Sequence, residues 1–137
     1  MHQIFPIEYQ KAKFKNKIKV TYDEDNLYIM ANLYDDDIEN ISRNIMSKGQ
    51  DICQDDIFGL VIDPFNDETN GYYFATNANG FKEEGLIANN RSYIGDWDGV
   101  WQVKTSVHDK YWSVEIAIPF KSLSFDQENA QWGINFF

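Results

Sequence analysis

Cysteine and long apolar runs are scarce in this chain of 137 residues, and each absence excludes a class of protein. Cys53 is the only cysteine, so an internal disulfide and a cysteine-based zinc site are both excluded. No run of about 18 apolar residues occurs, so the sequence predicts no membrane-spanning segment. The N-terminal residues also lack the apolar core of a signal peptide.

Positive charge is scarce as well. The chain has 12 Lys and Arg against 22 Asp and Glu, which gives a formal net charge of -10. Such a charge opposes the neutralisation of phosphates on which nucleic-acid binding depends, so we expect no nucleic-acid partner. The acidic surplus suits solubility, cation binding or a neutral ligand such as a glycan.

Aromatic residues, in contrast, are abundant. Phe, Trp and Tyr make up 16% of the chain, which favours strands in packed sheets. The length and the ordinary hydrophobic share of 43% fit one globular domain. The final residues "WGINFF" stop in the middle of a strand pattern. We therefore expect residues 1–137 to form a single domain that is a fragment of a longer protein.

Alternation of apolar and polar residues predicts antiparallel strands. In residues 26–34 the side chains of Leu27, Ile29 and Leu33 fall on one face of a strand. The polar turn "DEDN" joins this strand to the one before it, as in a hairpin. A second hairpin spans residues 100–118. The remaining predicted strands cover residues 58–63, 72–77, 83–90 and 131–137.

Helices are predicted to be short, because the longest helical pattern is "DIENISRNI" and "PFKSL" fits one helical turn after Pro119. About seven or eight short strands with polar turns indicate an all-β fold, an antiparallel β-sandwich of the jelly-roll type. The predicted core residues alternate along these strands: Leu27, Ile29, Leu60, Ile62, Phe74, Trp101, Val103, Trp112, Val114 and Ile116.

The stretch "GDWDGVW" is the main candidate for a binding site. Trp97 lies in a polar turn, and its indole could cover the apolar face of a sugar. Asp96, Asp98 and Asn77 would then accept hydrogen bonds from the sugar hydroxyls. The alternative is a structural turn, in which the aspartates cap backbone NH groups and Trp97 covers the sheet edge. Trp101, in either case, is expected on the buried face of the next strand.

Acidic turns raise the possibility of a structural calcium ion. The turn "DPFNDETN" offers Asp63, Asn66 and Asp67, and "DDD" offers residues 35–37, all with the oxygen donors that calcium prefers. Neither turn has the spacing of an EF-hand, and the alternative is a plain solvated loop.

No catalytic motif is found. His2 and His108 are the only histidines, and the sequence has no G-x-S-x-G elbow, P-loop or H-E-x-x-H motif. Glu83 and Glu84 are adjacent, so on a strand they point to opposite faces and cannot flank one glycosidic bond. The sequence therefore predicts that the domain is not an enzyme.

The ordered motifs "KVTYDEDNLYIMANLYDDD", "DDIFGLVIDPFND", "YYFATNANG", "WDGVW" and "YWSVEIAIPFKSL" resemble the family 9 carbohydrate-binding module fold over roughly residues 17–137. More narrowly, the chain is similar to the modules at the N-terminus of bacterial proteins with a predicted outer-membrane barrel. The resemblance implies export to the bacterial cell envelope, a glycan or polysaccharide ligand, and a C-terminal barrel domain as a possible partner.

Sugar-binding members of this family hold the ligand with two tryptophans, a strand glutamate and a strand arginine. The resemblance places the first tryptophan near Ile52, the glutamate at Phe58 or Gly59, and the arginine at Ala75, so none of these residue types is retained. The second tryptophan would lie in a C-terminal segment beyond Phe137. Two hypotheses follow: a glycan-binding module, or an accessory domain without sugar affinity that packs on a partner domain or barrel.

Overall fold

In the part of the chain that it describes, the computed structural model has β-strands, short 3-10 turns and the loops that join them. The residues that it describes are 2–3, 10–11, 16–42, 44, 55–89, 92–95, 97–125, 128 and 131–137. The strands are β1 (His2–Gln3), β2 (Gln10–Lys11), β3 (Lys17–Tyr22), β4 (Asn26–Tyr34), β5 (Ile57–Asp63), β6 (Gly71–Asn77), β7 (Lys82–Ala88), β8 (Ser92–Ile94), β9 (Gln102–Val107), β10 (Tyr111–Pro119) and β11 (Gly133–Phe136).

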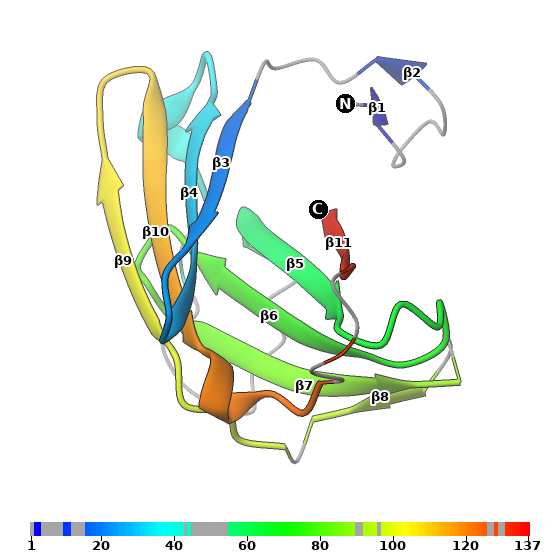
Figure 1. Ribbon diagram of the computed structural model, residues 1–137. Helices are drawn as coiled ribbons and strands as arrows, with labels where there is room; N and C mark the ends of the chain where they lie inside the picture. The colour runs from blue at the N-terminus through cyan, green and yellow to red at the C-terminus, as the bar shows by residue number, and fades with distance from the viewer. Residues whose placement is uncertain are drawn as a thin grey trace.

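Two antiparallel sheets pack face to face (Figure 1). The four-stranded sheet has the order β3-β4-β10-β9, and the five-stranded sheet has the order β11-β5-β6-β7-β8. A separate two-stranded pair is formed by β1 and β2. The arrangement confirms the predicted antiparallel β-sandwich. None of the helices found among the described residues has the length and apolarity needed to cross a membrane.

The pairing of β4 with β10 sets the register of the four-stranded sheet. Ile29 lies opposite Ile116, and Leu33 lies opposite Trp112. Both strands bury every second residue, so these pairs all point toward the other sheet. Alternate residues such as Met30 and Glu115 consequently lie on the outer face of the sandwich.

The β3–β4 turn is held by one carboxylate. Asp23 accepts hydrogen bonds from the backbone NH groups of Asp25 and Asn26, each at 2.8 Å, and from the hydroxyl of Tyr28 at 2.8 Å. These bonds, the one from Asp25 first, favour the charged carboxylate and lower the pKa of Asp23. The predicted "DEDN" turn is thus confirmed, with its first residue as the acceptor.

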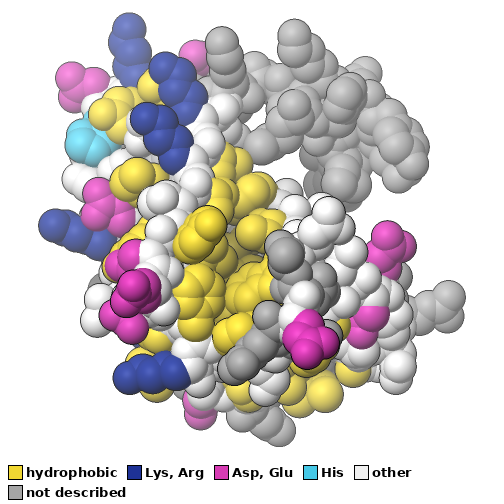
Figure 2. Space-filling view, viewed as in Figure 1, with side chains coloured by type: hydrophobic (Ala, Val, Ile, Leu, Met, Phe, Trp, Pro, Cys, Tyr) yellow, Lys and Arg dark blue, Asp and Glu magenta, His cyan; other side chains and the backbone are white. Residues whose placement is uncertain are grey.

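One side of the sandwich is open between the sheets. Val20 and Tyr22 lie opposite the core residues Ile29 and Leu27, so they face inward, yet they are 45% and 76% exposed. Figure 2 shows hydrophobic side chains gathered in the hollow between the two sheets on this side. The edge strand β3 is therefore only partly covered by the five-stranded sheet.

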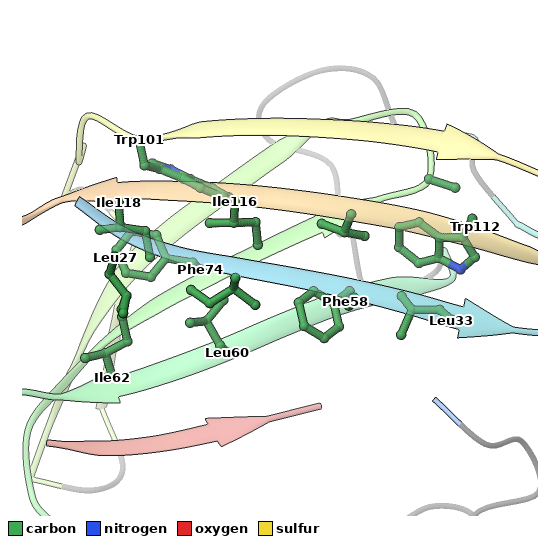
Figure 3. Packing of buried hydrophobic residues seen from close by; sticks show 14 of the residues in the cluster. Leu27, Leu33, Phe58, Leu60, Ile62, Phe74, Trp101, Trp112, Ile116 and Ile118 are labelled. Carbon is green, nitrogen blue, oxygen red and sulfur yellow. The ribbon is translucent and has the colours of Figure 1, made fainter. Parts of the chain in front are cut away.

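The core contains the residues that sequence alternation predicted (Figure 3). All ten are buried except Val103, which is half-buried and packs against the same cluster. Trp101 is buried as expected, although it precedes β9 instead of lying within it. The structure adds the short strand β8, and the segment "DIENISRNI" contains the 3-10 turn η1 (Ile38–Asn40). The predicted turn after Pro119 is confirmed as η3 (Phe120–Ser122).

Replacing Trp112 by alanine is expected to lower the free energy of unfolding by about 3 to 5 kcal/mol, because the indole is 4% exposed and its loss leaves a cavity. Urea denaturation of the purified domain measures this change. Glu115→Ala, on the exposed face of the same strand, is the control and should stay within about 0.5 kcal/mol of the parent. Equal effects of the two substitutions would contradict the core assignment.

Candidate functional site

Trp97 packs back onto the sandwich. It is half-buried, and its ring centroid lies 5.1 Å from that of Tyr72 and 5.9 Å from that of Phe74. Gly99 lies under the indole, since a Cβ atom there would be 2.3 Å from the ring. Tyr72 and Phe74 are on the inner face of β6, so Trp97 covers an edge of the core, as in the structural alternative.

Trp101 ties the same segment to β7. Its Nε1 donates a hydrogen bond to Oε2 of Glu84 at 3.1 Å. Nζ of Lys82 donates to the carbonyl oxygen of Trp101 at 2.9 Å and lies 5.4 Å from the ring centroid. The segment from Trp97 to Trp101 is therefore anchored by buried or half-buried rings at both ends.

Asn77 is an internal residue, so its predicted role as a sugar ligand at the surface is wrong. It has no exposed surface. Its Oδ1 accepts the backbone NH groups of Asn79 and Phe81, each at 3.1 Å, and its Nδ2 donates to Oδ2 of Asp55 at 3.0 Å. The amide shapes the β6–β7 turn and is not accessible to a ligand, because a polar residue after an alternating strand can turn inward to satisfy backbone groups.

The other two polar residues of the predicted glycan site are Asp96 and Asp98. Asp98 is exposed beside Trp97. Asp96 lies outside the described residues. Since Asn77 faces the interior, the structure does not bring the predicted set together at one exposed surface.

The predicted calcium ligands act as turn caps. Asp63 accepts the backbone NH groups of Phe65 at 3.2 Å and Glu68 at 2.8 Å. Asp67 accepts those of Thr69 at 2.8 Å and Asn70 at 2.9 Å. The bonds from Asn70 and then Thr69 lower the pKa of Asp67, because they favour the charged carboxylate.

The remaining predicted calcium donors also lie in loops between strands. Asn66 is one of the few non-glycine residues with positive φ, at 52°, as a tight turn requires. In the "DDD" turn, Oδ1 of Asp35 accepts the backbone NH of Asp37 at 2.9 Å. Within the described ranges, no group of three or more His, Cys, Asp or Glu side chains is placed to hold a metal ion. The acidic turns thus match the solvated-loop alternative.

The outer face of the five-stranded sheet carries a cluster that the sequence did not predict. Tyr73, Tyr93 and Phe137 form this outer aromatic cluster. The Tyr73 and Phe137 rings stack at 5.5 Å with an interplanar angle of 19°, and the Tyr73 and Tyr93 rings meet edge to face at 5.2 Å. Tyr93 is 48% exposed and Phe137 47% exposed. Aromatic surface is therefore available to solvent here.

Two glycines make room for the cluster. A Cβ atom at Gly59 would be 2.3 Å from the ring of Phe137, and one at Gly85 would be 2.5 Å from the ring of Tyr93. The backbone of Phe137 pairs with Gly59 through two hydrogen bonds, at 2.9 and 3.0 Å. The hydroxyl of Tyr93 donates to Oε1 of Glu83 at 3.3 Å. The rings therefore lie directly on the sheet.

A pocket of about 530 Å³ lies on the same outer face. Val61 contributes to its apolar part and is directly opposite both Tyr73 and Asn135 in the sheet register, so the pocket adjoins the outer aromatic cluster. Its polar lining includes Asp63, Glu68, Asn70 and Asn135. A lining that combines apolar side chains with hydrogen-bonding groups suits a small molecule that has apolar and hydroxyl-bearing surfaces.

Two of the positions that the resemblance assigns to ligand residues, Gly59 and Ala75, fall on this face. Gly59 and Ala75 lie opposite each other in the β5–β6 pairing, whereas Phe58 points into the core. Gly59 is thus the position that shares a face with Ala75. The ring of Phe137 covers Gly59 in this chain, and Ile52 lies outside the described residues.

The family described as "Carbohydrate family 9 binding domain-like" matches residues 4–137. This chain belongs to that family. A solved structure titled as a carbohydrate binding module family 9 from Caldicellulosiruptor kristjanssonii in complex with glucose matches the family 9 domain described here with 21% identity and a TM-score of 0.62. The match covers 91% of this chain and 59% of that chain, and it supports the fold. A search of the curated proteins finds no match.

Trp97→Ala is expected to destabilise the family 9 domain by about 1 to 3 kcal/mol, because the indole packs on Tyr72 and Phe74. The melting temperature of the variant measures this loss. Val100→Ala, which truncates a 71% exposed side chain in the same segment, is the control. A Trp97 variant as stable as the control, with altered glycan binding, would restore the indole as a ligand platform.

Excess EDTA is expected to leave the melting temperature unchanged, because the carboxylates of Asp63 and Asp67 are occupied by backbone NH groups. Differential scanning fluorimetry with added calcium or EDTA measures the effect. A rise in melting temperature with calcium, which by mass action reports an ion bound to the folded state, would contradict the assignment of these residues as caps.

Proposed function

We propose that this family 9 domain is a non-catalytic glycan-binding module that holds a sugar against the outer aromatic cluster. The observation that carries the proposal is the position of two half-exposed rings, Tyr93 and Phe137, beside a pocket with polar lining residues. Stacking covers the apolar face of a pyranose, and the polar lining residues fix its hydroxyls.

The size and charge of the site support a small neutral ligand. Pockets for small molecules commonly measure about 300 to 1,000 Å³, and the pocket at about 530 Å³ falls in this range. Among the residues that line the pocket, Glu68 can accept hydrogen bonds from hydroxyls, and Asn135 can both accept and donate them. A neutral sugar is also not repelled by the net charge of -10.

The placement of the adjacent acids supports a binding role without catalysis. Glu84 accepts the hydrogen bond of Trp101 on the inner side of β7, while Glu83 accepts that of Tyr93 on the outer side. Two carboxylates on opposite faces of one strand cannot act on the same glycosidic bond. The glucose in the related family 9 structure also supports a sugar as the ligand class.

The cellular setting that we propose is the bacterial cell envelope, with export from the cytoplasm and a C-terminal barrel domain in the full-length protein. The support is the resemblance to modules that precede a predicted outer-membrane barrel. Fractionation of cells that express the full-length protein checks the location, and recovery in the cytoplasm would contradict it.

One observation favours a second candidate function, an accessory domain that packs on a partner domain. Val20 and Tyr22 face inward but remain 45% and 76% exposed, and Figure 2 shows apolar side chains in the hollow between the two sheets. Exposed apolar surface of this kind is typical of protein contacts. In that case the aromatic cluster would have no affinity for sugars.

Tyr93→Ala is expected to weaken glycan binding at least tenfold, about 1.4 kcal/mol, because it removes a half-exposed ring from the platform. A glycan array identifies the ligand, and calorimetry then compares the variants. Tyr22→Ala, which removes a 76% exposed ring from the other sheet, is the matched control and should bind as the parent does. An array without any hit would favour the accessory domain.

A further inference from the structure

The outer face of the four-stranded sheet carries a group of lysines. The sheet register places Lys19, Met30, Glu115 and Lys104 in one row across the four strands. The next row contains Lys17, Asn32, Ser113 and Ser106. We call these two rows the basic sheet face.

The charge of this face differs from that of the whole chain. Lys17, Lys19 and Lys104 outnumber the single acid, Glu115, and all four side chains are exposed. The chain as a whole has a formal charge of -10. Figure 2 shows Lys and Arg side chains, with Asp and Glu side chains between them, on the side of the molecule formed by the four-stranded sheet. A local positive strip on an acidic protein can attract an anion where the rest of the surface repels it.

The basic sheet face is also hollowed and rich in hydrogen-bonding groups. Two shallow cavities of about 430 and 360 Å³ share Met30 and Glu115 as lining residues. Asn32 and Ser113 line the smaller cavity. Nε2 of His108 lies 3.2 Å from Oγ of Ser113. Small polar side chains between the lysines leave room for a ligand to lie along the sheet.

The spacing of the lysines fits a ligand that carries several negative charges. Lys19 and Lys104 are on the two edge strands, so three strand spacings of about 4.8 Å put their backbones about 14 Å apart. A chain of acidic sugars can place a separate carboxylate near each ammonium group, whereas a monosaccharide offers only one.

We propose that the basic sheet face binds an acidic polysaccharide built from uronic acids, which lies across the strands with its carboxylates near Lys17, Lys19 and Lys104. The hydroxyls of such a chain would meet Asn32 and Ser113. This surface is on the opposite sheet from the outer aromatic cluster and takes a ligand of different charge, so it goes beyond the function proposed above.

Affinity electrophoresis in gels that contain polygalacturonate tests the proposal, with neutral dextran gels as the reference. We expect polygalacturonate to retard the domain at low salt, and about 0.15 M salt to weaken the retardation by screening. The double variant Lys19→Gln/Lys104→Gln should lose at least tenfold in affinity. The matched control is Lys110→Gln/Lys121→Gln, which removes two exposed lysines outside the two rows and should change affinity less than twofold after correction for net charge.

Four results would overturn the proposal: no retardation by polygalacturonate, equal retardation by dextran, equal loss in the two double variants, or loss of polygalacturonate binding in Tyr93→Ala. The last would move the acidic ligand to the outer aromatic cluster. Because the lysines are exposed, both double variants should keep the melting temperature of the parent. An unchanged melting temperature would show that a loss of affinity does not come from unfolding. If polygalacturonate does not bind, the sugar site proposed at Tyr93 is unaffected, because the glycan array and calorimetry test it separately.

Discussion

The packing of two sheets through alternate side chains is the constraint on which the rest of the structure depends. Ile29 and Ile116 from one sheet meet Leu60 and Phe74 from the other, and all four are nearly or fully removed from solvent. Burial of this apolar surface is the main favourable term in folding. Since the side-chain period of a strand is two, fixing the inner face also decides which residues lie on each outer face.

The residues of both candidate surfaces follow from which residues form the inner face. Once Phe74 points inward, Tyr73 must point outward, next to Val61 on the neighbouring strand. In the four-stranded sheet, once Ile116 points inward, Glu115 must point outward and lie among the lysines of the outer face. A slip of one residue in either strand would bury a charge or an exposed ring, so the core and the outer surfaces select the same register.

Sequence patterns predicted the sandwich and its core because alternation is a local signal. Leu27, Ile29 and Trp112 could be assigned from their own strands without knowledge of which strands pair. The outer aromatic cluster could not be predicted in this way, since Phe137 and Gly59 are far apart in the sequence and meet only through the β11–β5 pairing. The signal that could have found it is glycine at a strand position that alternation assigns to a face, which often marks a close approach.

The polar site residues were harder to predict, because a polar side chain in a turn has two uses. Asn77 and Asp67 resemble ligand-binding groups in the sequence, yet both are occupied by backbone NH groups that the turns leave without strand partners. Trp97 is similar, since a ring in a polar segment can cover either a sugar or the core beside it. Exposed rings on a regular strand, such as Tyr93, avoid this competition because the sheet already satisfies their backbone. Aromatic rings that contact a ligand are therefore better sought, in this fold, on the outward positions of paired strands than in its turns.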